Sequence, residues 1–320
     1  MNGAPGGSRA LRLGTRRSPM AMAQSAHVAR LLSASTGCLV DLVGYSTFGD
    51  ESKAGLAQIG GTGVFVSELR KRLLTGDIDF AVHSLKDLPA VTDPALVLAA
   101  VPQREDPRDA LVARSGAKLA DLPAGARIGT GSPRRAAQVL LLRPDVRPVP
   151  IRGNAGTRLG KVDSGEVDAV VLAYAGLARI GRLDAVSQVF EPDEMMPAPG
   201  QGALAVECLA SRPELAELLS QADDAPSRAA TTAERTVLAA LQAGCSAPIG
   251  AYAAGTSVLR LDAIVAGEVA GEQALRASAA GPAGQAARIG RQVAAALLSR
   301  GAGRYTDVSE GHRTNGDDAK

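Results

Sequence analysis

Two adjacent arginines directly follow a glycine-containing turn at residues 129–135, Gly-Thr-Gly-Ser-Pro-Arg-Arg. The residues before the turn are typical of a short strand, and Arg134 to Leu142 is typical of a helix. Ser132 is a favourable N-cap for that helix, and Pro133 suits its first position. Free backbone N–H groups and the positive end of the helix dipole then meet two guanidinium groups, which predicts an anion-binding turn. A capped surface helix with two solvated arginines is the simpler interpretation of this segment alone.

More cationic side chains lie on neighbouring turns. Between residues 104 and 161 the chain has twelve Lys and Arg against five Asp and Glu. Arg152 and Arg158 flank a second glycine-containing turn, and Arg16 and Ser18 hold the corresponding place early in the chain. With the arginine pair, these side chains predict a cleft for a ligand with several carboxylates or phosphates. Scattered surface charge explains any one of these arginines better than it explains the group.

Lys86 and Asp87 follow an apolar segment, Asp79 to His83, that predicts a buried strand. Ligand sites of α/β sheets lie beyond the carboxyl ends of such strands. A carboxylate near lysine and arginine stays ionised near neutral pH, so Asp87 could stabilise a cationic intermediate or transfer a proton. A surface ion pair of Lys86 and Asp87 is the alternative, and His83 is expected to pack within the strand.

Cys245 lies in a tight loop, Gly244-Cys245-Ser246-Ala247-Pro248. An exposed loop thiol can be a nucleophile or an attachment point. No histidine lies near it in the sequence to act as a base, so covalent attachment is favoured over thiol hydrolysis. An inert thiol is the ordinary alternative for a lone cysteine.

The chain has 320 residues, 46% of them hydrophobic, with a formal net charge of +2 and only 2% aromatic residues. This composition favours a soluble protein of two or three domains, without nucleic-acid or membrane partners. The three cysteines and three histidines show no spacing typical of disulfides or metal ligands, so we expect no metal site and a reducing compartment. Residues 1–9 lack the apolar segment of a signal peptide, which favours the cytoplasm.

Two sequence patterns occur twice, in the same order. Ser18-Pro19-x4-Gln24 matches Ser132-Pro133-x4-Gln138, and Gly76-Asp77-Ile78-Asp79 matches Gly165-Glu166-Val167-Asp168. The repeat predicts two similar α/β lobes, each with strands and helices alternating over a mostly parallel sheet. Chance similarity within an alanine- and glycine-rich chain is the alternative.

The predicted first lobe comprises residues 10–103 and 197–221, the second lobe 104–196, and a small α+β domain 222–302. Residues 1–9 and 303–320 are expected to be unstructured tails, and the glycine-rich stretch 44–63 a flexible lid. Apolar segments predict strands at 11–13, 40–43, 79–83, 97–100, 126–128, 203–208, 251–253 and 258–265. Helices are predicted at 19–32, 64–74, 134–142, 229–242 and 285–298.

Taken together, these segments resemble the porphobilinogen deaminases, also called hydroxymethylbilane synthases, over about residues 11–300. The motifs that carry the resemblance occur in the family's order, which makes it specific. They are Gly14-Thr15-Arg16-x-Ser18-Pro19, Thr47-x-Gly49-Asp50, Val82-His83-Ser84-Leu85-Lys86-Asp87-Leu88-Pro89, Arg104-Glu105-Asp106-Pro107-Arg108-Asp109, Ser132-x-Arg134-Arg135, Arg152-Gly153-Asn154-x-Gly156-Thr157-Arg158, Gly200-Gln201-Gly202-Ala203 and Gly244-Cys245-x-x-Pro248-Ile249-Gly250.

The resemblance implies a three-domain α/β protein whose first two lobes are similar to periplasmic binding proteins. It implies a monomeric transferase of tetrapyrrole (porphyrin and haem) biosynthesis. Its reaction joins four porphobilinogen molecules head to tail, with loss of ammonia, to give hydroxymethylbilane. A covalent dipyrromethane cofactor starts the growing pyrrole chain. By the resemblance, the cysteine that holds it through a thioether bond is Cys245.

Roles for individual residues follow from the same resemblance. The catalytic carboxylate falls on Asp87. Cofactor-binding positions fall on Ser84, Lys86, Thr130, Ser132, Arg134, Arg135 and Arg158. Substrate-binding positions fall on Arg16, Ser18, Gln24, Arg152 and Gln201. Each pyrrole carries an acetate and a propionate, so clustered arginines suit such a ligand.

Two other functions fit part of the sequence. A two-lobed binding protein that captures an anionic ligand would need neither Asp87 nor a covalent group, and a secreted one would carry a signal peptide. An inactive paralogue would keep the fold, although the presence of Asp87 and Cys245 speaks against it.

Overall fold

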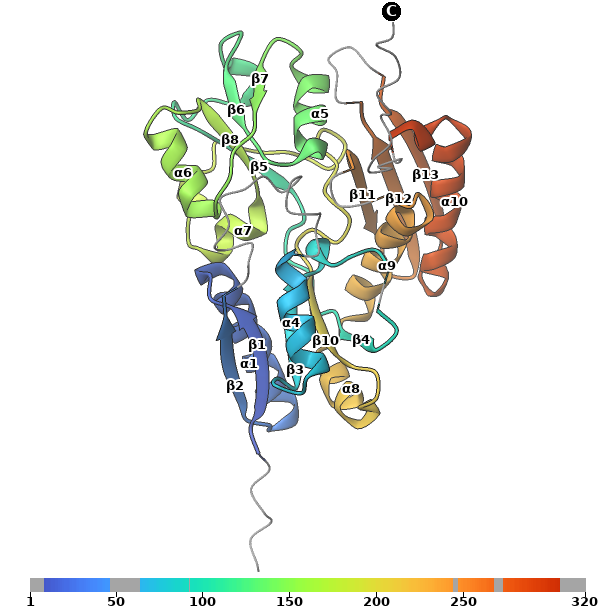
Figure 1. Ribbon diagram of the computed structural model, residues 1–320. Helices are drawn as coiled ribbons and strands as arrows, with labels where there is room; N and C mark the ends of the chain where they lie inside the picture. Colours follow the sequence, from blue (N-terminus) through green and yellow to red (C-terminus); the bar gives the residue numbers. More distant parts are fainter. Residues whose placement is uncertain (1–8, 47–63, 92, 244–246, 268–272, 306–320) are drawn as a thin grey trace, which may run out of the picture.

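The computed structural model describes residues 9–46, 64–91, 93–243, 247–267 and 273–305. Figure 1 shows two α/β lobes, one blue and one green, with a third unit in orange and red beside them. Cys245, the Thr47-x-Gly49-Asp50 motif and most of the predicted lid lie outside the described residues. None of the described helices has both the length and the apolar character needed to cross a membrane.

The first lobe is built on a five-stranded sheet in the order β2-β1-β3-β10-β4. The three strands β2, β1 and β3 are parallel, and β10 pairs antiparallel with both β3 and β4. The strands are β1 (Leu11–Arg16), β2 (Val40–Tyr45), β3 (Phe80–Ser84), β4 (Leu96–Ala100) and β10 (Leu204–Leu209), and the helices are α1 (Pro19–Thr36), α4 (Val64–Leu74) and α8 (Pro213–Leu219). The prediction that the chain returns to the first lobe after the second is therefore confirmed.

The second lobe repeats this plan in the order β7-β6-β8-β5-β9. Here β5 is the antiparallel strand, between β8 and β9. The strands are β5 (Asp109–Ala113), β6 (Arg127–Gly129), β7 (Arg147–Val149), β8 (Ala169–Ala173) and β9 (Gln188–Val189), and the helices are α5 (Pro133–Leu142), α6 (Ala155–Asp163) and α7 (Tyr174–Arg179). The mostly parallel sheets predicted for both lobes are confirmed.

Both lobes share one hydrogen-bonding pattern between two neighbouring parallel strands, β1 and β3 in the first lobe and β6 and β8 in the second. In the first lobe, Asp79 accepts from the backbone N–H of Arg12 at 2.9 Å and from its Nε at 3.2 Å. In the second, Asp168 accepts from the backbone N–H of Arg127 at 2.7 Å and from its Nε at 3.2 Å. These aspartates end the second repeated pattern, so the internal repeat is present in structure as well as in sequence.

The two repeated aspartates give a matched test of stability. Asp79 is 4% exposed and also pairs with Arg9 and Arg212, whereas Asp168 is 39% exposed. Asp79→Asn should lower the free energy of unfolding by about 2–3 kcal/mol, because it breaks several charge-assisted hydrogen bonds to one buried group. Asp168→Asn should cost less than about 1 kcal/mol.

The pH dependence of unfolding checks the same pair. Burial would raise the pKa of Asp79, but hydrogen bonds from Arg12, Arg212 and Arg9 outweigh it and hold that pKa far below its usual range. The stabilisation is therefore complete above about pH 4 and is lost as the pH falls further. Denaturant titrations from pH 7 to pH 3 should show a shallower acid loss in Asp79→Asn than in the parent. Equal curves for the parent and Asp79→Asn would contradict this account.

The third unit packs helices α9 (Ala225–Ala240) and α10 (Ala286–Ser299) on an antiparallel sheet. The sheet contains β11 (Ile249–Ala254), β12 (Val258–Val265) and β13 (Leu275–Pro282). Strand β13 was not predicted. The expectation of unstructured tails is wrong at both inner ends, because Arg9 pairs with Asp79, and Ala302–Tyr305 forms a 3-10 turn whose Ala302 is buried.

Buried ionic groups join the third unit to the lobes. Glu234 of α9 is fully buried and pairs with Arg104, with an Nη1–Oε1 distance of 2.6 Å. The same carboxylate accepts from the backbone N–H of Gly200 at 2.7 Å. Arg104 and Gly200 belong to the two segments that cross between the lobes, so α9 is anchored where the lobes meet. The exact domain limits remain a prediction.

Candidate active site at the junction of the lobes

The turn before α5 has the predicted form. Ser132 is the N-cap, and its hydroxyl accepts from the backbone N–H of Arg135 at 3.4 Å. Thr130 is buried, and its hydroxyl accepts from the backbone N–H of Ser132 at 3.2 Å. A Cβ on Gly131 would lie 2.8 Å from the carbonyl oxygen of Ile151, so only glycine fits this close approach of two backbones.

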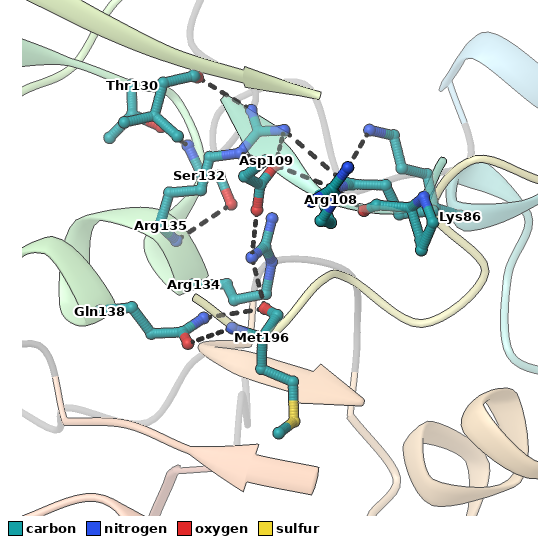
Figure 2. A network of polar contacts seen from close by, with 12 residues as sticks. Lys86, Arg108, Asp109, Thr130, Ser132, Arg134, Arg135, Gln138 and Met196 are labelled. Atoms are coloured by element: carbon teal, nitrogen blue, oxygen red, sulfur yellow. Dashed lines mark hydrogen bonds and ion pairs between the residues drawn. The ribbon is translucent and has the colours of Figure 1, made fainter. Parts of the chain in front are cut away.

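Arg134 and Arg135 both hold an anion that belongs to the protein itself (Figure 2). Each guanidinium lies 2.7 Å from one carboxylate oxygen of Asp109, the first residue of β5. Asp109 is fully buried, and the arginines are 3% and 5% exposed. The arginine pair is therefore buried on an internal anion rather than solvated at the surface, and the binding of a ligand anion at this turn stays a prediction.

The charges of this cluster stabilise one another. Burial would raise the pKa of Asp109, but Arg134 and Arg135 outweigh burial and hold that pKa far below its usual range. Burial lowers the pKa of Arg134, which Asp109 counteracts. Two cations share one buried anion, so the cluster carries an excess of positive charge.

Gln201 connects this cluster to the first lobe. Its side chain is fully buried, donates to Asp109 Oδ1 at 2.9 Å and to the carbonyl of Pro107 at 2.7 Å, and accepts from Lys86 Nζ at 3.2 Å. Lys86 lies in a 3-10 turn, Leu85–Asp87, at the carboxyl end of β3. The structure thus brings Lys86, Asp109 and Arg135 together from both lobes around one amide.

Positive charge is also crowded around Lys86 and Arg158. The pKa of Lys86 is lowered to about 8, first by burial and then by Arg135, while Asp87 acts in the opposite direction. The pKa of Arg158 is lowered to about 10 by burial and by Arg135, again opposed by Asp87. Asp87 is therefore close enough to act on both cations, in a site where added carboxylates would be stabilised.

The lowered pKa of Lys86 leads to a measurable prediction. An amine-selective acylating reagent reacts with the neutral amine, so labelling of Lys86 in the cofactor-free protein should rise through about pH 8. Ligand carboxylates beside Lys86 would favour its charged form and move this midpoint toward the ordinary lysine value of about 10.4. Mass spectrometry of labelled peptides measures both, with the exposed Lys71 as control. A midpoint near 10.4 in the cofactor-free protein would contradict the prediction.

The remaining predicted residues lie around the same junction. Gln24 of α1 is buried and donates to the hydroxyl of Ser84 at 3.0 Å. Ser18 is the N-cap of α1, where its hydroxyl accepts from the backbone N–H of Ala21. Arg16 ends β1 and is partly exposed, whereas Arg152 is exposed before α6. Their roles in binding stay a prediction.

Family comparisons agree with this arrangement. The model described as "Porphobilinogen deaminase, dipyromethane cofactor binding domain" matches residues 11–217, and the model for the C-terminal domain of the same family matches residues 229–299. The chain belongs to the porphobilinogen deaminase family. A porphobilinogen deaminase of Thermobifida fusca is 58% identical over 300 residues, covering 91% of this chain and 94% of the relative. Porphobilinogen deaminase 1 of Streptomyces coelicolor is 54% identical over 308 residues, covering 92% and 96%.

Among solved structures, the methionine-binding protein MetQ is similar with a TM-score of 0.43 and 12% identity, over 66% of this chain and 89% of that one. The VFT2 domain of Bordetella pertussis BvgS has a TM-score of 0.38 and 19% identity, over 66% and 84%.

The cofactor of the porphobilinogen deaminases suits the described residues. A dipyrromethane carries several carboxylates, and Arg134 and Arg135 share the single carboxylate of Asp109, which leaves excess positive charge. The Nε of Arg134 is also buried without a hydrogen-bond partner among the described residues, so one donor of the cluster is available. Arg134, Arg158 and Lys86 would hold the carboxylates.

Asp109 is the central residue that sequence reasoning missed. In the sequence it is only the last residue of the Arg104–Asp109 motif, with no sign that its carboxylate lies between the two arginines. The Arg104–Asp109 motif was part of the family resemblance, which was the one available signal. Gln138 was seen only in the repeat, yet its buried amide donates to the carbonyl of Met196 and accepts from the backbone N–H of Met196 (Figure 2).

Proposed function

We propose that this protein is a hydroxymethylbilane synthase. It would join four porphobilinogen molecules head to tail, release four molecules of ammonia, and consume one water to release hydroxymethylbilane. The observation that carries this proposal is that Lys86 and Arg158 each lie close to both Arg135 and Asp87, in a family whose cofactor and substrate are polycarboxylates.

Asp87 is the proposed catalytic residue. When porphobilinogen loses ammonia, positive charge spreads onto its pyrrole nitrogen, and a carboxylate at that nitrogen stabilises it. The same carboxylate can accept a proton as the new carbon–carbon bond forms. Lys86 and Arg158 lie close to Asp87 and would bind ring carboxylates on either side of it.

The other arginines divide between the two ligands. Arg134 and Arg135, with Ser84, Thr130 and Ser132, support the cofactor. Arg16, Ser18, Gln24 and Arg152 take the incoming substrate. Gln201 is proposed to position the binding residues, because its buried amide holds Lys86, Arg135 and Asp109 in place.

Cys245 is the proposed attachment point of the dipyrromethane, which when bound supplies the pyrrole carbon that starts the chain. The other two cysteines are poorly suited. Cys208 is fully buried, and burial raises the pKa of its thiol to about 11. Cys38 follows the carboxyl end of the 18-residue helix α1, about 27 Å from the Ser18 end.

The intact mass of the denatured protein tests the proposal. We expect an excess mass equal to one dipyrrole, absent from Cys245→Ser. A bare polypeptide mass that gains no dipyrrole after incubation with porphobilinogen would contradict a synthase and favour a protein that only binds anions. Cys38→Ser is the control and should keep the added mass.

We further propose a cytoplasmic monomer with no nucleic-acid or membrane partner, as expected for an enzyme acting on small acids. Light scattering of the purified protein measures the oligomeric state, and a dimer mass would contradict this part alone.

A further inference from the structure

A cavity apart from the candidate active site is lined by residues 88–90, which follow Lys86 and Asp87 in the chain. Its volume is about 170 Å³, the space of about five or six liquid-water molecules, which suits a small ligand. Helices α4 and α9, strands β4 and β10, and residues 88–90 line it. None of the proposed catalytic, cofactor-binding or substrate-binding residues is among the lining residues.

The lining has one net positive charge and an apolar side. Arg70 and Arg235 are cationic, and Glu207 is anionic. Glu207 is 1% exposed and accepts from Arg70 Nε at 3.0 Å and from Arg70 Nη2 at 2.7 Å. These two hydrogen bonds fix the orientation of the Arg70 guanidinium. Leu88 and Leu98 supply apolar contacts on the same cavity. This combination favours a small monoanion with an apolar body.

Arg235 also contacts the catalytic segment. Its Nη1 donates to the carbonyls of Leu85 and Leu88, each at 3.1 Å, and its Nη2 donates to the carbonyl of Pro89 at 2.5 Å. These carbonyls stand on both sides of Lys86 and Asp87 in the chain. One guanidinium in the wall of the cavity thus holds the backbone around the proposed catalytic carboxylate.

We propose that this cavity binds a small organic monocarboxylate and that its occupancy slows catalysis. A carboxylate is a stronger acceptor for a guanidinium than a backbone carbonyl. A ligand carboxylate at Arg235 would therefore compete with the carbonyls of Leu85, Leu88 and Pro89 and let the segment shift. Catalytic geometry is sensitive to displacements of this kind.

Benzoate is the probe, and benzamide is its uncharged control of similar shape. We expect calorimetry on the holoenzyme to show one benzoate site with a dissociation constant of about 1 mM or tighter. Saturating benzoate should lower kcat severalfold without changing the KM for porphobilinogen. Benzamide should bind at least about tenfold more weakly.

Two variants of α9 separate this cavity from the active site. Thr232 is exposed and lines the cavity, so Thr232→Glu should weaken benzoate binding at least about tenfold by charge repulsion. Ala240 is exposed on the same helix and does not line the cavity, so Ala240→Glu should bind benzoate as the parent does.

Absence of binding, equal binding by Thr232→Glu and the parent, or competition with porphobilinogen would overturn the site. Binding without a change in kcat would overturn the coupling to the catalytic segment. That coupling rests on the proposed role of Asp87, whereas calorimetry tests the site whether or not the protein turns over.

Discussion

Replacing Asp87 with alanine is expected to lower the turnover number by at least about 10³-fold while the protein stays folded. Asp87 is partly exposed at the end of a 3-10 turn, so its loss leaves no cavity in a core. Burial lowers the pKa of Lys86 and of Arg158, and the Asp87 carboxylate opposes that change. Without it, the site keeps its cations but has no anion to stabilise the charge on a pyrrole nitrogen.

Single-turnover assays with porphobilinogen measure the effect, and the thermal unfolding midpoint checks the fold. Asp87→Asn keeps the shape and removes the charge, so it should be almost as slow as Asp87→Ala. Asp41 of β2 is exposed, and Asp41→Ala is the control that should keep full activity. Near-normal turnover in Asp87→Ala would show that another residue is catalytic.

The second large effect is expected from Asp109. Asp109→Ala leaves the guanidinium groups of Arg134 and Arg135 buried without their shared anion. Breaking a buried ion pair from one side costs about 3–5 kcal/mol. That is a large fraction of the stability of an ordinary domain, so the second lobe should unfold at least about 12 °C lower.

Asp109→Ala should also load little cofactor, because the mutual repulsion of the arginines disperses the donors that bind it. Asp106→Ala is the matched control from the same segment. Its partner Arg108 is 31% exposed, so the loss should stay below about 1 kcal/mol. Calorimetry and intact mass measure the two effects. An unchanged unfolding temperature in Asp109→Ala would mean that the arginines find other partners.

Local sequence signals predicted much of the fold. Val64–Leu74 and Val258–Val265 have the predicted limits, because apolar periodicity and flanking glycines mark both. Strand β13 was missed because its sequence, LRASAAGP, is rich in alanine and small residues that favour strands weakly. Pairing with β12 along all eight residues makes it a strand, and no local pattern shows such a partner.

The candidate site was predicted in its parts but not in its connections. The cap, the arginine pair and the Lys86–Asp87 segment could be read from residue types. Contact between Gln201 and Lys86 joins residues 115 positions apart, and that between Asp109 and Arg135 joins residues 26 apart. Such contacts depend on how segments far apart in the chain pack against one another, which residue types do not specify.

The antiparallel strand of each sheet has a consequence for how the chain folds as it is made. Strand β10 lies between β3 and β4, although the whole second lobe separates it from them in the sequence. Strand β5 follows directly after the first lobe, so the second sheet has its antiparallel strand at once. A ribosome must therefore release the chain as far as Leu209 before the first sheet can close. The lobe that is begun first is thus completed after the second lobe, and the edges of β3 and β4 that pair with β10 stay open while residues 101–203 are made.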